Sequence, residues 1–196
     1  MRTKTKTSNM LRSVARAIFP VSIGVLVLTG CTSVPDKPLP TVETLDVPRY
    51  MGRWYEIAKL PSRFQASCAS DTVARYRLSG QGVEVLNACR RADGSVSSIS
   101  GRATAEPGSG GARLRVTFFW PISGDYWVLA VDPSYETALV GTPSRKYAWV
   151  LARKPTLDDA QLQALLARAQ ALGFDRSAFV RTPQAAPIPD DRRDAN

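Results

Sequence analysis

The chain has 196 residues, a formal net charge of +9 and no histidine, and 44% of its residues are hydrophobic. Without histidine, Ser-His-Asp and Cys-His catalytic sites are excluded, as is any metal or haem site that needs an imidazole ligand. Five basic residues and no acidic ones fall within residues 1–30, so loss of that segment would lower the charge from +9 to +4. The remaining basic residues are scattered among acidic ones, which argues against a nucleic-acid-binding surface.

Residues 1–30 have the organisation of an export signal. A basic segment precedes an apolar run over Ala17–Leu28, and these 12 residues are too few to span a bilayer. The run closes in Leu28-Thr29-Gly30-Cys31, which resembles the lipobox of bacterial lipoproteins. The resemblance implies cleavage before Cys31, a diacylglycerol on its sulfur and an acyl chain such as palmitate on the new amine. The alternative is an ordinary secretory signal followed by an incidental cysteine.

The residues after the cysteine suggest a location. In the sorting rule of Gram-negative lipoproteins an aspartate at the next position retains the protein at the inner membrane, so Thr32 implies the outer membrane, with the domain facing the periplasm. Stable attachment takes more than one acyl chain, which the lipobox resemblance supplies. Residues 31–45 are rich in proline and are predicted to form an extended tether between the lipid and the domain.

Two further cysteines stand in the rest of the chain. If Cys31 carries lipid, Cys68 and Cys89 form an even pair in an oxidising compartment, which favours a disulfide. The bridge would close a loop of about 20 residues and contribute roughly 3 kcal/mol in the chain-entropy model. Two separate buried thiols are the alternative. A disulfide would leave neither cysteine able to bind zinc, so no metal site is expected.

Residues 46–183 are predicted to form one domain, built mainly from strands. Hydrophobic residues alternate with polar ones in eight runs, and turn residues separate the runs. Eight antiparallel strands in up-and-down order can close into a β-barrel wide enough for one small ligand. The sequence therefore predicts an all-β, eight-stranded antiparallel barrel. The eight runs are Trp54–Leu60, Thr72–Leu78, Val83–Ala88, Val96–Ala105, Arg113–Trp120, Tyr126–Val131, Thr137–Val140 and Tyr147–Ala152.

One helix is expected after the last strand. Thr156 with Asp159 approximates a capping box, five leucines recur at helical spacing from Leu157 to Leu172, and Gly173 follows as a C-cap. An amphipathic helix of about 16 residues would need a partner for its leucines, and the outer face of the barrel is available. Residues 184–196 are rich in proline and charge and are predicted to be a flexible tail.

Three motifs in this domain resemble signatures of the lipocalin family. Gly52-Arg53-Trp54-Tyr55 continues into Glu56-Ile57-Ala58 and resembles the first signature. The segment from Asp132 to Tyr135 resembles the turn between two central strands, and Trp149–Arg153 resembles the last-strand motif that ends in arginine. The resemblance covers about residues 43–183 and is closest to the bacterial outer-membrane lipocalins of the Blc type.

The resemblance assigns roles to residues by position. Trp54 would lie across the closed end of the barrel under Arg153, with Gly52, Asp132 and Tyr135 as further structural residues. Strand parity then sorts the wall. The side chains predicted to point inward, as core or as ligand contacts, are Glu56, Ala58, Tyr126, Val128, Ala130, Tyr147, Trp149 and Leu151, and those predicted to point outward are Trp127 and Leu129.

Glu56 is the unusual member of the inward set. It could be a neutral acid, pair with Arg75, Arg102 or Arg115, or be a partly solvated carboxylate. General-acid catalysis would need a second group that the sequence does not supply.

The resemblance implies a binding protein without a cofactor. Its ligand would be a fatty acid, lysophospholipid or similar amphiphile that the protein stores or transports in the bacterial envelope. Two alternatives are a structural or stress-related envelope lipoprotein with a filled barrel, and a lipid-converting enzyme, against which the missing histidine and acid pair count. The sequence leaves open whether two copies pair in a homodimer.

Overall fold

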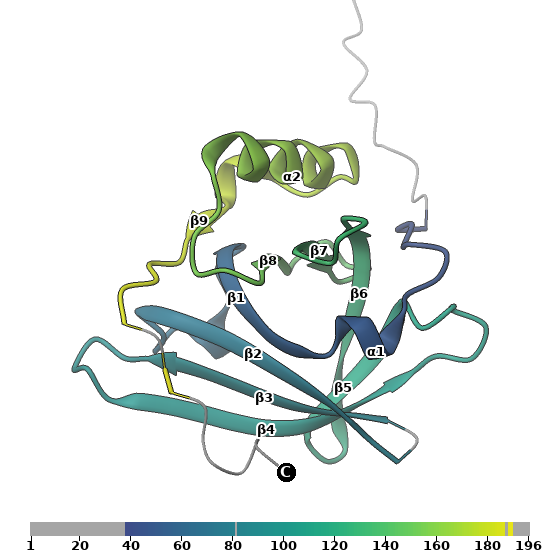
Figure 1. Cartoon of the computed structure of the whole chain (residues 1–196), viewed down its shortest axis with the longest axis horizontal. Helices are drawn as coiled ribbons and strands as arrows, with labels where there is room; N and C mark the ends of the chain where they lie inside the picture. The colour runs from purple at the N-terminus through teal and green to yellow at the C-terminus, as the bar shows by residue number, and fades with distance from the viewer. Residues whose placement is uncertain (1–37, 81, 187, 190–196) are drawn as a thin grey trace, which may run out of the picture. The chain divides into compact units, whose positions relative to one another are not determined.

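The computed structural model describes residues 38–80, 82–186, 188 and 189, so the predicted signal segment, Cys31 and the first part of the tether lie outside the described residues. The eight-stranded antiparallel barrel and the helix after it are confirmed (Figure 1). The sequence did not predict the four short elements Val47–Tyr50, Arg63–Gln65, Arg176–Ala178 and Val180–Arg181. In chain order the elements are α1 (Val47–Tyr50), β1 (Gly52–Lys59), η1 (Arg63–Gln65), β2 (Ser70–Ser79), β3 (Gly82–Arg90), β4 (Val96–Ala105), β5 (Arg113–Phe119), β6 (Ile122–Val131), β7 (Thr137–Gly141), β8 (Ala148–Ala152), α2 (Asp159–Ala171), η2 (Arg176–Ala178) and β9 (Val180–Arg181).

The sheet closes because β1 pairs with both β2 and β8. Each strand from β1 to β8 is antiparallel to its neighbours, so the connections alternate between the two ends of the barrel. We call the end with the β1–β2, β3–β4, β5–β6 and β7–β8 connections the mouth. The other end, where α1 enters and β8 leaves, is the closed end. Beyond the point where β2 separates from β1, the two-residue strand β9 pairs with Ala58 and Lys59 of β1.

Two apolar clusters lie on the two faces of the sheet. The inner cluster lies inside the barrel around Trp54, Val85 and Val128. The outer cluster joins the sheet to α2 through side chains such as Val150 and Leu162. The helix expected outside the barrel is therefore confirmed. No helix in the described part of the chain is long and apolar enough to cross a membrane.

The start of α2 differs from the prediction. Its N-cap is Asp158, whose carboxylate accepts a hydrogen bond of 2.8 Å from the backbone N–H of Gln161, so the predicted capping role of Thr156 is wrong. Leu157 packs against the outer cluster just before the helix begins. An N-cap side chain accepts from a backbone N–H of the first helical turn, and because α2 begins at Asp159 the residue in that position is Asp158.

Two β-bulges reverse the parity predicted for the strands that contain them. The pairing of β1 shifts between Glu56 and Ala58, and that of β6 shifts between Val128 and Ala130. Each extra residue turns all later side chains of its strand to the opposite face. The predicted inward positions of Ala58 and Ala130 are therefore wrong, because both belong to the outer cluster. Lys59 turns into the barrel instead, opposite Trp149.

Both flanking segments pack on the barrel where the structure describes them. Leu39 and Leu45 of the predicted tether are buried, and the backbone N–H of Val42 donates to the carbonyl of Val128 at 3.0 Å. In the predicted tail, Ile188 is buried and Gln184 donates its amide to backbone carbonyls of β1 and β2. These parts therefore differ from a free tether and tail, because apolar side chains and backbone donors find partners on the barrel.

The tail is also fastened by a buried carboxylate. Asp71 accepts hydrogen bonds of 2.7 and 2.9 Å from the backbone N–H groups of Ala185 and Ala186 and pairs with Arg90 at 3.1 Å. Burial alone would raise the pKa of Asp71, but the hydrogen bonds from Ala186, Ser70, Ala185 and Arg90 outweigh it and lower that pKa.

Candidate functional site

The closed end is sealed by an arginine stacked on a tryptophan. The guanidinium carbon of Arg153 lies 3.9 Å from the ring centroid of Trp54, which is completely buried. The same guanidinium donates to the carbonyls of Arg53 at 2.8 Å, Arg49 at 2.9 Å and Tyr135 at 3.2 Å. A desolvated cation–π contact contributes up to about 2 kcal/mol, and the three hydrogen bonds tie α1, β1 and the β6–β7 turn to one side chain. This arrangement is the plug that the resemblance implied.

The other signature residues also act on the backbone at this end. Gly52 has φ of 93°, and a Cβ there would lie 3.3 Å from Nη1 of Arg153, so a side chain would meet both strain and crowding. The carboxylate of Asp132 accepts hydrogen bonds from Ser134 and Thr137 and so closes the β6–β7 turn. These contacts are structural and leave the barrel interior to other residues.

Inside the barrel, the wall is apolar and partly open. Phe118, Tyr126 and Trp149 belong to the inner cluster, yet each keeps part of its surface accessible. Gly101 makes room for one of these rings, since a Cβ there would come within 2.7 Å of Cδ1 of Phe118. Inward-facing aromatic side chains that remain accessible indicate unfilled space next to them. Tyr126, Val128 and Trp149 thus point inward as predicted, and ligand contact by them stays a prediction.

Three tyrosines meet deep inside the barrel, next to Trp54. The hydroxyl of Tyr126 lies 2.8 Å from that of Tyr50 and 3.0 Å from that of Tyr76. The ring centroid of Tyr50 lies 4.7 Å from that of Trp54 and 5.8 Å from that of Tyr76. Burial raises the pKa of Tyr76 to about 12 and raises the pKa values of Tyr50 and Tyr126 well above 10. We call Tyr50, Tyr76 and Tyr126 the tyrosine cluster.

Sequence reasoning found only one member of the tyrosine cluster. Tyr76 faces Gly52 across the β1–β2 pair, so the parity argument that turned Trp54 inward would also have found it, had it been applied to β2. Tyr50 enters from α1, a single turn of helix whose N-cap is Asp46, and no strand pattern reveals it.

Nearer the mouth, Glu56 is buried among polar partners. Its carboxylate pairs with Lys59 at 3.2 Å and accepts hydrogen bonds from Gln65 at 2.7 Å and from the Thr182 hydroxyl at 2.5 Å. Gln65 in turn accepts a hydrogen bond of 3.0 Å from the indole N–H of Trp149. Glu56 therefore points inward as predicted, and it is fully engaged within the protein.

The three arginines suggested as partners of Glu56 are elsewhere, so that alternative is wrong. Arg75 donates to the carbonyls of Ile188 and Pro189 on the outer face. Arg102 reaches a backbone carbonyl at the β2–β3 turn, and Arg115 lies 3.5 Å from Asp125. Their positions alternate with inward residues, so they face outward, whereas the bulge in β1 turns Lys59 toward Glu56.

The mouth exposes large apolar side chains. Phe64 in η1 is 63% exposed, and where β5 turns into β6 Phe119, Trp120 and Ile122 are 68%, 89% and 74% exposed. The ring of Phe64 lies 5.1 Å from that of Tyr147, whose ring stacks near Trp149 at 6.4 Å. An aromatic path therefore runs from the rim into the barrel.

The predicted disulfide is present at the mouth. Cys68 precedes β2, Cys89 lies near the end of β3, and their sulfurs are bonded with the two Cα atoms 5.5 Å apart. The bond ties the long β1–β2 connection to the barrel wall.

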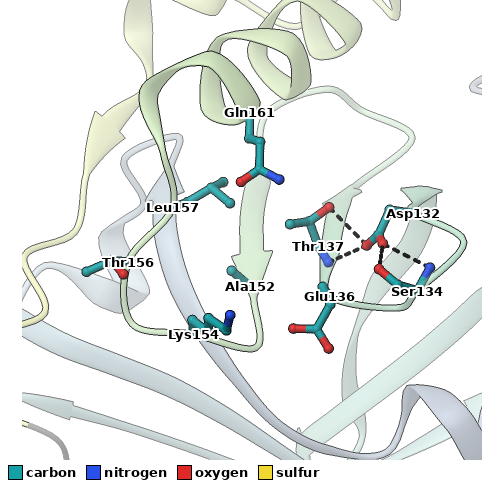
Figure 2. A pocket seen from close by; sticks show the side chains of 9 residues that line it. All are labelled: Asp132, Ser134, Glu136, Thr137, Ala152, Lys154, Thr156, Leu157 and Gln161. Carbon is teal, nitrogen blue, oxygen red and sulfur yellow. Dashed lines mark hydrogen bonds between the residues drawn. The ribbon is translucent and has the colours of Figure 1, made fainter.

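A hollow lies outside the barrel, beside the closed end. Its volume is about 270 Å³, and Figure 2 shows Asp132, Thr137, Ala152, Leu157 and Gln161 around it. Ala152 belongs to the outer cluster, so this hollow is separate from the interior. Within the described residues, no group of three or more Cys, Asp or Glu side chains could hold a metal ion.

Comparison with known proteins agrees with this architecture. The family described as "Lipocalin-like domain" matches residues 45–184. Temperature-induced lipocalin-1 of Arabidopsis thaliana is 42% identical over 163 residues, which are 79% of this chain and 87% of the plant protein. Outer membrane lipoprotein Blc of Escherichia coli K12 is 36% identical over 160 residues, covering 81% of this chain and 90% of Blc. Insecticyanin of the tobacco hornworm Manduca sexta shares the fold, with a TM-score of 0.61 and 24% identity over 74% of this chain and 83% of its own. The chain belongs to the lipocalin family, whose members bind small hydrophobic ligands and are typically not enzymes.

Proposed function

We propose that this protein is a lipid-anchored lipocalin of the bacterial outer membrane that holds an amphiphilic lipid, such as a fatty acid or lysophospholipid, for storage or transport. The observation that carries the proposal is the contrast along the barrel axis. Trp54 is completely buried at the closed end, whereas Phe118, Tyr126 and Trp149 stay partly accessible inside the wall. Such a barrel, sealed at one end and lined by apolar and aromatic groups with a few polar atoms, suits a lipid tail.

Trp149 gives a direct readout of binding. Because its indole faces the interior, a long-chain fatty acid or lysophospholipid is expected to quench the tryptophan emission of the purified protein. Trp149→Phe should remove most of that quenching and change affinity little. Trp127→Phe is the matched control, since Trp127 faces outward under the guanidinium of Arg113, and it should leave the quenching intact.

Mass spectrometry of lipid carried through purification complements the titration. A bound lipid, released on denaturation, supports the proposal. If no lipid co-purifies and no amphiphile binds, the barrel is filled and the proposed function is wrong. Turnover of the bound lipid would contradict a binding role in favour of an enzyme.

The membrane attachment rests on Leu28-Thr29-Gly30-Cys31, which lies outside the described residues, and is supported by the 36% identity to an outer membrane lipoprotein. Cys31→Ala is expected to move the protein from the membrane to the soluble fraction, because the acyl chains could no longer be added. Cys31→Ser is a second variant that removes the thiol with little change in size. Sedimentation of both variants with outer membrane would show that the lipobox interpretation is wrong.

A further inference from the structure

The tyrosine cluster has one more hydrogen than its own hydrogen bonds use. Three phenols carry three O–H donors, and two hydrogen bonds join them, one between Tyr50 and Tyr126 and one from Tyr76 to Tyr126. If Tyr126 donates to Tyr50, the proton of Tyr50 is left over. If Tyr50 donates to Tyr126, the proton of Tyr126 is left over. Among the described residues, no other acceptor is hydrogen-bonded to these three hydroxyls.

This surplus donor lies in an apolar and buried setting. Tyr50 and Tyr76 are 3% and 8% exposed, and the surrounding inner cluster includes Val85, Leu114 and Val128. A buried donor without an acceptor is unfavourable, so the position favours a ligand that brings one. Tyr126 keeps part of its surface accessible, so a molecule inside the barrel could reach the cluster.

The electrostatics of the cluster select a neutral acceptor. Phenols are protonated at neutral pH, and burial raises the pKa of all three further. The positive charge of Arg153 lowers the pKa of Tyr76 and the negative charge of Glu56 raises it, both less than burial does. The guanidinium of Arg153 stacks on Trp54 and already donates to three backbone carbonyls. Lys59 is paired with Glu56. Because Arg153 and Lys59 make their hydrogen bonds elsewhere, an ionised carboxylate at the cluster would lose its hydration without gaining either of them as a hydrogen-bond partner.

We propose that the inner end of the barrel binds a neutral carbonyl group of the ligand, such as an ester, ketone or protonated acid, through the surplus phenol proton of the tyrosine cluster. The hydrocarbon of the ligand would extend from there along Phe118 and Trp149 toward the mouth. The inference rests on the proposed function and sharpens it, because it specifies which end of the lipid lies deepest and in which charge state.

The count of protons determines which substitution tests the proposal. Replacing Tyr50 or Tyr76 alone by phenylalanine removes one proton and one hydrogen bond, so one surplus proton remains. Only the triple variant Tyr50→Phe/Tyr76→Phe/Tyr126→Phe removes it. Replacing all the partners by apolar groups of the same shape is close to neutral for folding, so the triple variant should fold. Tyr55→Phe is the matched control, a buried tyrosine of the outer cluster.

The experiment compares methyl laurate, ionised laurate and dodecane as ligands of the purified protein in a fluorescence titration. The unmodified protein is expected to bind methyl laurate roughly tenfold more tightly than dodecane, which is the effect of one net hydrogen bond. Tyr50→Phe, Tyr76→Phe and Tyr55→Phe should keep this preference. The triple variant should lose it and still bind dodecane.

An infrared spectrum gives a second readout that does not depend on affinity. The ester carbonyl band of bound methyl laurate should lie at lower wavenumber than in alkane solution, and it should return to the alkane value in the triple variant. Equal binding of ester and alkane by the unmodified protein, with no band shift, would overturn the carbonyl proposal and leave the proposed function standing. Tightest binding of ionised laurate would also overturn it. Failure of all three ligands to bind would instead count against the proposed function.

Discussion

The two ends of the barrel differ in how far their large side chains are buried. At the closed end Trp54 is completely buried, and Arg153 joins α1, β1 and the β6–β7 turn through one guanidinium. At the mouth Trp120 is 89% exposed, and a disulfide adds a covalent tie to the β1–β2 connection. The same residue type thus contributes to the core at one end and lies in solvent at the other.

This contrast suggests that the closed end determines folding stability and that the mouth determines access of the lipid to the barrel. Burial of large side chains and desolvated hydrogen bonds concentrates the folding free energy at the closed end. Exposed apolar groups at the mouth contribute little to folding, so their presence there calls for another explanation, and contact with a ligand or a membrane is the usual one. Stability and lipid access should therefore respond to different substitutions.

The largest expected effect is loss of the closed-end plug. Trp54→Ala should lower the free energy of unfolding by about 3–5 kcal/mol, because it truncates a buried indole. Arg153→Ala removes the stacked cation and three hydrogen bonds, and the two losses should not be additive. A double-mutant cycle measured by urea denaturation should give a coupling of roughly 0.5–3 kcal/mol.

Matched substitutions at the mouth are the control for this prediction. Trp120→Ala and Arg63→Ala change the same residue types at exposed positions and should each shift the free energy of unfolding by no more than about 0.5 kcal/mol. Additive losses from Trp54 and Arg153 would show that the stacked pair does not act as a unit. Comparable losses at Trp120 would remove the distinction between the two ends.

The disulfide is the main exception to a mouth with little stabilising structure. Cys68→Ser/Cys89→Ser should lower the free energy of unfolding by roughly 3 kcal/mol, because the bond closes a loop with a sequence separation of 21. The denatured protein, isolated by export and without reductant, should show no reactive thiol from this pair. Two reactive thiols, or an unchanged stability in the double variant, would disprove this account.

The fold was predictable because successive side chains of a regular strand alternate between the two faces of the sheet. In β8 the residues from Ala148 to Ala152 alternate without interruption, and Trp149 and Leu151 point inward as the parity argument required. The same argument placed Glu56, Tyr126 and Val128 correctly, since each precedes the bulge in its strand. The motif resemblance added the pairing of Trp54 with Arg153, which no local pattern contains.

The parts that escaped prediction depend on one inserted residue or on distant contacts. A bulge leaves no distinct signature in sequences such as those around Ile57 and Leu129, yet it reverses every later side chain. The Thr182 hydroxyl reaches Glu56 across 126 residues of sequence, and composition alone assigned the neighbouring tail to a flexible segment. A single sequence does not reveal which distant residue a polar side chain contacts in the folded protein.

Alkaline pH should weaken the interior next to the closed end. The pKa of Tyr76 is raised by burial to about 12, and the pKa values of Tyr50 and Tyr126 are raised well above 10. In the unfolded chain these phenols lose their protons near pH 10, whereas the folded protein keeps them. Stability from the cluster is therefore fully present below pH 10 and declines as the pH rises toward 12.

Urea denaturation at a series of pH values between 8 and 12 measures this decline. The triple phenylalanine variant of the tyrosine cluster is the control, and its free energy of unfolding should fall less steeply over the same interval. Parallel curves for the two proteins would show that these tyrosines do not titrate differently in the folded and unfolded states.

The smallest effect on stability should come with a measurable effect on lipid transfer. Trp120→Ala leaves the free energy of unfolding within about 0.5 kcal/mol of its original value, because the indole is 89% exposed. Indole side chains favour membrane interfaces, so its removal from the rim should slow the transfer of a fluorescent fatty acid from vesicles to the protein several-fold. Leu78→Ala, an apolar residue 50% exposed at the closed end, should leave the transfer rate unchanged. If both variants slow transfer equally, the rate follows total surface hydrophobicity rather than the position of Trp120 at the mouth.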